Sequence, residues 1–491
     1  MSRMDRKQYI VLATSTPGEK KRGGLEPSSC HADKLASMLG KAFPEGATVP
    51  VTRSLVDESA MLELSEEQAA SFERANPNVN LYPARTYRLA AVDVDTVMMA
   101  SGPFPFNGLA TQAATPYRVK VVDSAGRAIA GVKIIVREWK VGEPVEAKTD
   151  EHGVATVPSH NGLAEYVLAI PFAGYWAKGQ RGVLASQGVV SFVLDNLDPA
   201  YEDCRKHHYP VSPPQSTNSA SVKVAVIDTG IDSHCDLSNV ACRTSHAQAD
   251  DDDDIYDNGT GHGTHVAGII GGNGVIRGIA PSASLMSYRV FERGARETVT
   301  FYIYDAVTAA VEDGADIINM SLGQSETDAV LEQAIRNAEA QGVLVVAASG
   351  NDGHDKPSYP ASYAEVVSVA AVGRIGTFPA DSLHGCNVQR VNGTDCQDFV
   401  PGFSNHGKVE LAAPGVAVVS TIGVDGYAAL DGTSMACPVV SGFAAMLLEN
   451  APEVKGRERS PERLTDLKQL LYRACNSLGF GRSDVGSGLP R

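Results

Sequence analysis

The chain has 491 residues, which is too long for one ordinary domain and predicts two or three. Hydrophobic residues make up 43% of it, and no apolar run approaches the length of a membrane helix. The formal net charge of −16 argues against nucleic acid and anionic membranes as partners, because either would attract a basic surface.

The N-terminal stretch MSRMDRKQYIVLATSTPGEK shows no secretion signal, because its apolar piece, YIVLA, is only five residues long. This favours a cytoplasmic location over secretion. The eight cysteines form no CxxC pair and are too few for a disulfide scaffold, so reduced thiols are expected. Cys386 and Cys396 share one polar segment, where a bridge is an option only in an exported protein.

Residues 1–100 predict an α+β domain. YIVLA has the composition of a strand, SEEQAASFERAN (65–76) begins like a capped helix, and LYPARTYRLA (81–90) predicts a returning strand. Residues 101–116 contain three prolines and many small residues, which indicates a linker.

Residues 117–198 predict a small β-sandwich. Runs such as YRVKVVD, GVKIIVREW and GVVSFVLDNL are rich in β-branched residues and alternate with Gly-rich turns. The Pro- and Ser-rich stretch HHYPVSPPQSTNSAS marks a second linker, placed at residues 199–221. The sandwich is open to interpretation as a spacer, a regulatory clamp or a binding module.

Residues 222–491 predict an α/β domain. The apolar runs KVAVIDTG, ADIINMSLG, GVLVVAASGN and EVVSVAAVG alternate with helical patterns such as DAVLEQAIRNAEAQG. Such a pattern is typical of a mainly parallel sheet with helices on both faces. Functional groups in these folds lie just beyond the carboxyl ends of the strands.

Four polar residues stand at such positions, and each has an ordinary structural explanation. Asp228 before Gly is a common turn former, and Asn351 after Gly is another. His262 lies in a Gly-rich loop, and Ser434 is placed to cap a helix. His262 and His265 are also spaced like metal ligands, but no carboxylate or cysteine stands beside them, which disfavours zinc.

Taken together, the four residues indicate a catalytic site rather than four separate structural roles. A carboxylate, an imidazole and a hydroxyl are the parts of a hydrolytic triad, and the Asn351 amide is suited to stabilise an oxyanion. The order Asp228, His262, Ser434 along the chain is the order found in subtilisin.

The motifs VAVIDTGID, GHGTHVAG, INMSLG, AASGN and GTSMACP, in this order, resemble the signature motifs of subtilisin-like serine proteases, the subtilases. The resemblance implies that Asp228 orients the imidazole, His262 is the general base and acid, Ser434 is the nucleophile and Asn351 donates to the oxyanion. It also implies that His265 is structural and that no cofactor is required for the chemistry.

The resemblance further implies a set of substrate-binding residues. The strand segment Ser321, Leu322 and Gly323 would pair with the extended substrate. The segment Ala348, Ser349 and Gly350 would line the first specificity pocket. The small residues of the second group predict an open pocket that admits a sizeable side chain.

The segment SAMLELSEEQAASFERANPNVNLYPARTYRL resembles the C-terminal half of a subtilase propeptide, which inhibits its own protease until it is cleaved off. An unrelated ferredoxin-like module is the alternative. Family propeptides usually abut the protease domain, whereas a sandwich intervenes here. The cleavage site is therefore expected either at residues 90–99 or in the linker before Val222.

Asp236 and the run Asp250–Asp254 are the candidates for binding structural calcium. Asp236 matches a family ligand position, but the loop IIGGNGVIR, where other ligands usually lie, has no carboxylate. The run Asp250–Asp254 has three interpretations: a solvated acidic loop, a calcium site, or a preference for basic residues near the cleaved bond.

The sequence thus predicts a serine endopeptidase that forms an acyl-enzyme and is made as a zymogen. Its partners would be protein or peptide substrates and its own propeptide as an intramolecular inhibitor. The rival interpretation is a catalytically idle subtilase fold that serves as a binding or scaffolding protein.

Overall fold

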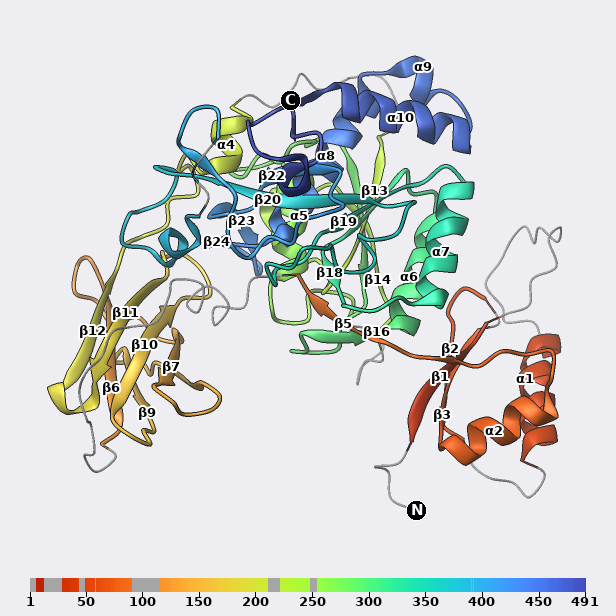
Figure 1. Cartoon of the computed structure of the whole chain (residues 1–491), viewed down its shortest axis with the longest axis horizontal. Coiled ribbons are helices and arrows are strands. Elements are labelled where there is room, and N and C mark those ends of the chain that lie inside the picture. Colours follow the sequence, from red (N-terminus) through yellow and green to blue (C-terminus); the bar gives the residue numbers. More distant parts are fainter. Residues whose placement is uncertain are drawn as a thin grey trace.

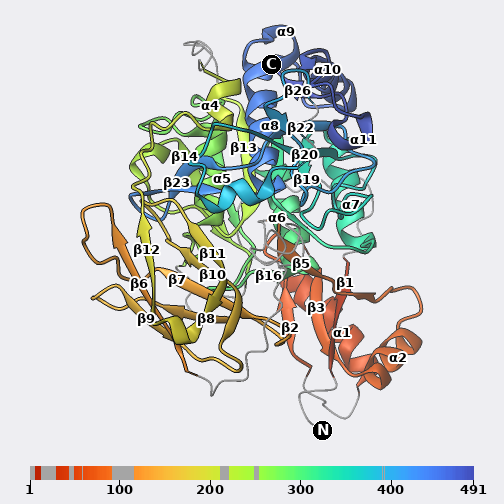
Figure 2. The same ribbon diagram turned by 60° about the vertical axis from the view of Figure 1, so that its left-hand side comes forward.

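A computed structural model of the chain describes three units, shown in Figure 1. An N-terminal α+β unit and a β-sandwich lie on either side of the lower part of a large α/β unit, and Figure 2 shows the same arrangement after a rotation. The described residues are 6–12, 29–43, 49–57, 59–90, 115–210, 221–247, 254–389, 391 and 393–491.

The N-terminal unit is a four-stranded sheet, in the order β2-β3-β1-β4, that packs with two helices. Its helix α2 begins at a capping box, in which the Ser65 hydroxyl accepts from the Gln68 backbone and the Gln68 side chain accepts from Ser65. The elements are β1 (Lys7–Val11), α1 (Ser29–Ala42), β2 (Val51–Arg53), β3 (Ala60–Leu64), α2 (Glu66–Ala75) and β4 (Tyr82–Pro83).

The returning strand expected at residues 81–90 is divided into two strands with different partners. The first, β4, pairs with β1 inside the N-terminal unit. The second, β5 (Thr86–Leu89), leaves this unit and forms a three-stranded sheet with β16 (Glu297–Val299) and β18 (Leu322–Gly323) of the α/β unit. The division occurs at Arg85, whose backbone N–H and C=O both bond to Thr300.

The sandwich consists of one sheet in the order β11-β10-β7-β8 and a second in the order β12-β6-β9. Their inward side chains form one buried apolar core, with Tyr117, Val119, Val136, Val167 and Phe192 among its members. The strands are β6 (Tyr117–Asp123), β7 (Lys133–Glu138), β8 (Val145–Lys148), β9 (Val154–Val157), β10 (Leu163–Ile170), β11 (Lys178–Leu184) and β12 (Val189–Leu194).

The segment expected to link the sandwich to the α/β unit differs from that expectation over its described part. Residues 199–210 include the helix α4 (Cys204–His208), which the Asp203 side chain caps. Arg205 and His208 are buried, and Arg205 donates to the Arg277 carbonyl of the α/β unit at 2.6 Å. This part of the segment is therefore packed onto the α/β unit, where the Arg205 side chain is both buried and hydrogen-bonded.

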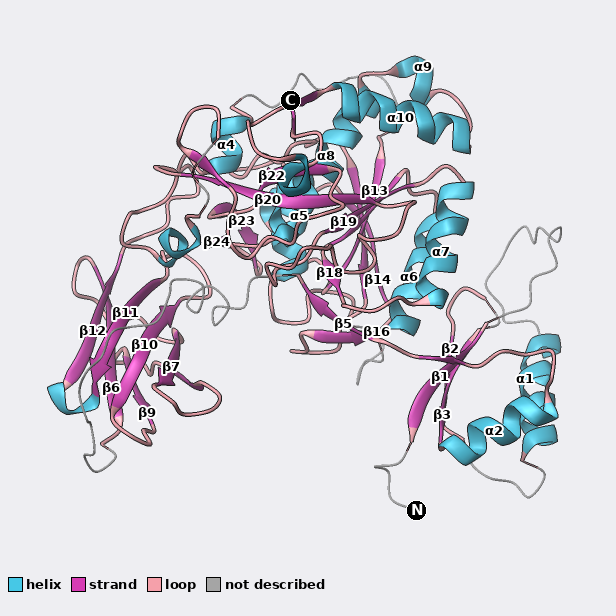
Figure 3. Ribbon diagram, viewed as in Figure 1, coloured by secondary structure: helices cyan, strands magenta, loops and turns pink. Residues whose placement is uncertain are grey.

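The α/β unit contains an eight-stranded, mainly parallel sheet, ordered β14-β15-β13-β17-β19-β20-β21 with β22 also paired to β20. Alternate side chains of β13 enter two different cores: Val224 and Val226 face the helices α5 and α8, whereas Ala225 and Ile227 face α6 and α7. Figure 3 shows helices covering both faces of the sheet. The predicted fold class is confirmed.

The remaining bounds of the α/β unit follow the chain. Its strands are β13 (Lys223–Asp228), β14 (Val240–Ser245), β15 (Ser284–Arg289), β17 (Ile317–Met320), β19 (Leu344–Ala348), β20 (Val367–Arg374), β21 (Asp398–Phe399), β22 (Leu411–Pro414), β23 (Val418–Ile422), β24 (Gly426–Leu430), β25 (Cys475–Asn476) and β26 (Leu489–Pro490). Its helices are α5 (His262–Gly271), α6 (Thr300–Glu312), α7 (Ala329–Ala340), α8 (Thr433–Glu449), α9 (Pro452–Lys455), α10 (Pro461–Arg473) and α11 (Arg482–Val485). Within the described ranges, no helix has both the length and the hydropathy that crossing a membrane demands.

Candidate active site

A buried carboxylate–imidazole pair lies where β13 ends and α5 begins. Asp228 is the last residue of β13, and His262 is the first residue of α5. The His262 Nδ1–H donates to Asp228 Oδ1 at 2.7 Å, and the Thr229 N–H donates to the same oxygen at 2.7 Å. This holds the ring with Nε2 on its far side, and Nε2 has no hydrogen-bond partner in the described part of the chain.

The loop that carries His262 is organised by Asp257. Its Oδ1 accepts the backbone N–H groups of Gly259 and Gly261 at 2.8 and 2.7 Å, and its Oδ2 accepts the Thr229 hydroxyl at 2.6 Å. Gly261 itself has a φ of 77°, a left-handed conformation that favours glycine. Burial raises the pKa of Asp257 to about 6, although these three donors oppose the shift.

This raised pKa predicts a pH-dependent stability. Between pH 4 and 6 the folded chain holds a proton on Asp257 that the unfolded chain releases, so the free energy of unfolding falls as the pH rises through this window. The contribution is about 3 kcal/mol at most, since it reflects a rise in pKa from 3.8 to about 6. Urea unfolding at pH 4.0 and 6.5 measures it.

The matched variant is Asp257→Asn, which keeps the shape of the side chain but cannot ionise there. The free energy of unfolding of the wild type should fall between pH 4.0 and pH 6.5 by up to about 3 kcal/mol more than that of Asp257→Asn. Equal changes in the two proteins would show that Asp257 does not titrate in this window.

Ser434 lies in the first turn of α8, opposite the end of β17. Its hydroxyl is buried and donates to the Ser321 carbonyl at 3.1 Å. The Ser321 hydroxyl in turn donates to the Ser434 carbonyl at 3.0 Å. These two bonds tie the first turn of the helix to the residue that follows β17.

Asn351 faces the same turn of α8 from the end of β19. Its Oδ1 accepts from the Thr433 N–H and the Thr433 hydroxyl, both at 2.9 Å, which sets the direction of the amide. Its Nδ2 is thereby free to donate, and the group that it meets is the carbonyl oxygen of Ala90. The Ser434 N–H donates to that same oxygen at 3.2 Å.

A carbonyl of the chain itself therefore occupies the place where two donors converge beside the Ser434 hydroxyl. Such a pair of donors is the arrangement that stabilises a developing oxyanion. Ala90 follows directly after β5, and its N–H donates to the Ser321 carbonyl at 3.0 Å. No signal in the sequence singled out Ala90 among the residues between 90 and 99.

The first group of expected substrate-binding residues contacts β5 directly. Leu322 and Gly323 form the strand β18, which pairs antiparallel with β5, opposite Leu89 and Arg88. The second expected group, Ala348, Ser349 and Gly350, is buried at the end of β19 and leads into Asn351.

A further contact of β5, made by Tyr87, was not predicted from the sequence. The Tyr87 side chain is completely buried, and its hydroxyl lies 3.1 Å from Asp328 Oδ2. Asp328 caps helix α7 and also accepts the Thr300 hydroxyl at 2.6 Å. An aromatic residue near the end of a returning strand was a usable signal, but nothing local indicated where it would bury.

His265 is buried and donates through Nε2 to the Ala428 carbonyl at 3.1 Å. Burial lowers its pKa to about 3, so the ring is neutral at ordinary pH. Its contact lies within the fold rather than with Asp228 or Ser434.

The residues around Asp236 do not fit a calcium site. Its carboxylate accepts the N–H groups of Val275 and Ile276 at 3.0 and 2.7 Å and the Tyr427 hydroxyl at 3.1 Å. Donors thus point protons at both oxygens, where a cation would need lone pairs. The neighbouring His234 Nδ1 is likewise engaged, by the Asp236 N–H.

Only the last residue of the acidic run Asp250–Asp254 is described. Asp254 pairs with Arg289 at 2.8 Å and with Arg293 at 3.6 Å. Its charge is therefore matched by arginines of the same unit. The other four residues of the run lie outside the described residues.

Comparison with known proteins gives consistent results for the C-terminal half of the chain. Residues 219–488 match the model of the subtilase family. Subtilisin BL of Lederbergia lenta is 37% identical over 247 residues, which cover 50% of this chain and 82% of that protein. Thermitase of Thermoactinomyces vulgaris is 33% identical over 278 residues, or 55% of this chain and 91% of that protein.

A third relative, the major intracellular serine protease of Bacillus subtilis, is 36% identical over 282 residues, which cover 55% of this chain and 80% of that protein.

Proposed function

The chain belongs to the subtilase family and is a serine endopeptidase, and on that basis we propose that it is a zymogen that cleaves itself after Ala90. In this proposal Asp228, His262 and Ser434 are the catalytic triad and Asn351 is an oxyanion donor. Subtilases need no cofactor for catalysis.

The observation that supports the proposal most directly is the position of the Ala90 carbonyl. Its oxygen accepts from the Ser434 N–H and from Asn351 Nδ2, so its carbon lies next to the Ser434 hydroxyl. The preceding residues run as an extended strand between β16 and β18. A protease substrate bound by strand addition has this form.

The chemistry follows from these positions. The Ser434 hydroxyl turns from the Ser321 carbonyl to His262 Nε2, gives up its proton and attacks the Ala90 carbonyl carbon. The oxyanion forms between Asn351 and the Ser434 N–H. The protonated His262, held by Asp228, then donates its proton to the nitrogen of Ala91, which leaves, and water releases the acyl group from Ser434.

Contacts away from the cleaved bond hold the N-terminal unit in place. Ile10 and Met61 of its sheet belong to the same buried cluster as Phe301 and Tyr302 of α6.

A polar contact lies beside this apolar one, on the same helix. The loop at Ser54 meets Asp305 of α6, which accepts the Ser54 hydroxyl and the Leu55 N–H. His246 donates to the same carboxylate at 2.8 Å. We therefore expect the cleaved unit to remain bound as an inhibitor.

The direct test is to purify the full chain and identify the new N-terminus by mass spectrometry. We expect fragments of residues 1–90 and 91–491. A first cleavage in the segment 199–221, or none in a chain that hydrolyses added peptides, would contradict the assigned cleavage site.

Tyr87 provides a second test, of inhibition rather than cleavage. Its buried ring is a large part of the contact, because burial of an aromatic side chain contributes several kcal/mol. We expect Tyr87→Ala to accelerate the appearance of activity after self-cleavage at least tenfold, as measured by hydrolysis of a chromogenic peptide.

The control is Arg88→Ala, one position along the same strand. Its ion pair with Glu297 is largely exposed, and such pairs contribute little. We expect the control to follow the wild-type time course closely. A similar acceleration in both variants would argue against a specific Tyr87 pocket.

The open first specificity pocket expected at Ala348, Ser349 and Gly350 stays a prediction. Cleavage of a peptide library by the processed enzyme tests it, and a strict preference for small residues before the cleaved bond would contradict it.

A further inference from the structure

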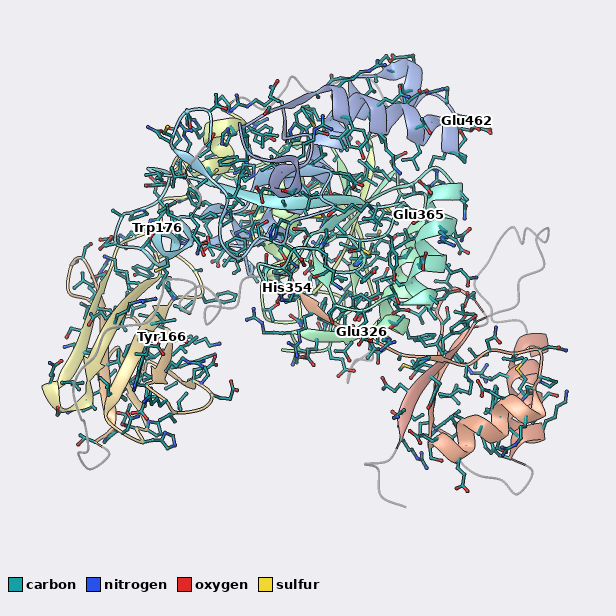
Figure 4. All side chains as sticks on the ribbon, in the orientation of Figure 1. Tyr166, Trp176, Glu326, His354, Glu365 and Glu462 are labelled. Carbon is teal, nitrogen blue, oxygen red and sulfur yellow. The ribbon has the colours of Figure 1, made fainter. Side chains whose placement is uncertain are left out.

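The loop Pro171–Tyr175, which joins β10 to β11 in the sandwich, is anchored firmly on the α/β unit. We call it the Phe172 loop. Its Gly174 N–H donates to the Tyr427 carbonyl of β24 at 2.9 Å. The next residue, Trp176, is 2% exposed and belongs to the main core of the α/β unit, where its ring lies 5.5 Å from that of His384. Figure 4 shows Trp176 where the two units meet.

Phe172 itself lies beside the residues that carry His262. A Cβ atom built on Gly261, the residue before His262, would lie 3.3 Å from the Phe172 ring, and one built on Gly423 would lie equally close. The ring is nevertheless 52% exposed. A large apolar side chain thus lies beside the residue that precedes His262, with about half of its surface accessible to a ligand.

The position of β5 indicates which side of the active site Phe172 borders. β5 fills the side between β16 and β18, where the residues before the cleaved bond lie. In Figure 1 the strand comes from the N-terminal unit, and the sandwich lies at the other end of the molecule. The residues of a substrate that follow the cleaved bond would therefore extend toward β23, β24 and the Phe172 loop.

We propose that Phe172 is a specificity-determining residue of the protease, and that its ring receives an apolar side chain from the first two substrate residues after the cleaved bond. Val424, the residue after Gly423, is a second exposed apolar side chain in this turn, at 64%. The proposal rests on the proposed function, because it takes Ala90 as the acyl residue.

Two further observations agree with this assignment. In the sequence, Ala90 is followed by Ala91 and Val92, so the chain's own cleavage site has small and branched apolar residues on this side. Cleavage after Ala90 also leaves the sandwich covalently joined to the α/β unit. Phe172 therefore stays with the enzyme for every later substrate, unlike the N-terminal unit.

The test compares substrates with and without residues after the cleaved bond. The processed full chain is given peptides in which Tyr-Arg-Leu-Ala is followed by Ala-Val or by Asp-Asp, and also Tyr-Arg-Leu-Ala p-nitroanilide, which has no such residues. We expect Phe172→Ser to lower kcat/KM for the Ala-Val peptide about tenfold and to leave the nitroanilide within twofold.

Two variants complete the design. Phe172→Leu retains an apolar surface and is expected to keep most of the preference for Ala-Val over Asp-Asp. Val193→Ser removes an equally exposed apolar side chain, 51% exposed in β12 of the same sandwich. We expect it to leave kcat/KM unchanged for all three substrates.

Three outcomes would overturn the inference. Equal losses on the nitroanilide and the Ala-Val peptide would mean that Phe172 only supports the fold around His262. An unchanged preference in Phe172→Ser would mean that substrates do not reach the ring. A wild-type chain that hydrolyses none of the three substrates would contradict the proposed function, and the inference with it.

Discussion

Replacing Ser434 with alanine is expected to leave the chain intact at 491 residues, whereas the wild type is expected to divide after Ala90. The substitution removes the hydroxyl positioned to attack the Ala90 carbonyl, while the two oxyanion donors remain. Loss of the serine in subtilisin, a relative of this chain, lowers kcat by about 10⁶-fold, and we expect an effect of that order. Gel electrophoresis of the purified chain over several days measures it.

Labelling with a fluorophosphonate probe separates loss of the nucleophile from loss of the fold. The processed wild type should label and Ser434→Ala should not, while Ser238→Ala, at an exposed serine, should label fully. Ser434-independent labelling, or self-cleavage in the alanine variant, would refute the role assigned to Ser434. A subtilase fold used only for binding would show no labelling in any variant.

Replacing Asn351 with leucine is expected to lower kcat by about 10²–10³-fold and to change KM little. This magnitude is the one known for loss of the oxyanion asparagine in subtilisin, a relative of this chain. The reason is that Asn351 Nδ2 donates to the Ala90 carbonyl oxygen, which becomes negatively charged only during the reaction. Steady-state hydrolysis of a peptide p-nitroanilide by the processed enzyme gives both constants.

Asn351→Asp distinguishes the donor from the fold around it. The aspartate retains an oxygen that accepts from the Thr433 N–H, as Asn351 Oδ1 does at 2.9 Å, but it replaces the donor with a negative charge. We expect it to be at least as inactive as the leucine variant. Near-normal kcat in Asn351→Asp would show that the amide serves only to position α8.

The sequence predicted the sheet, the helices and the four polar residues of the site because these depend on local patterns. Buried parallel strands appear as apolar runs, and the residues that end them, such as Asp228 and Asn351, must lie at one edge of the sheet. The family resemblance then assigned a chemical role to each. The confirmed result is the subtilase fold with serine endopeptidase activity.

Pairing between strands that lie far apart in the chain could not be predicted from the sequence. The strand pattern of residues 81–90 is continuous, yet the structure divides it into two strands. The first half pairs with β1 in the same unit, and the second half pairs with β16 and β18, which lie more than 200 residues further along the chain. Alternation of side chains shows that a segment is extended but does not identify its neighbour. For the same reason, the packing of α4 and the position of the Phe172 loop could not be predicted from the sequence.

The junction at Arg85, where the backbone passes from one unit to the other, also has a consequence for how activity depends on dilution. In the proposed zymogen, β5 is tethered to the active site before cleavage, so self-cleavage would proceed at a rate independent of protein concentration. After the proposed cleavage the same strand would be held only by contacts such as those of Tyr87, and occupancy of the active site would become a bimolecular equilibrium. Zymogen molecules would therefore mature at one rate everywhere, while the fraction that is active would rise as the protein is diluted.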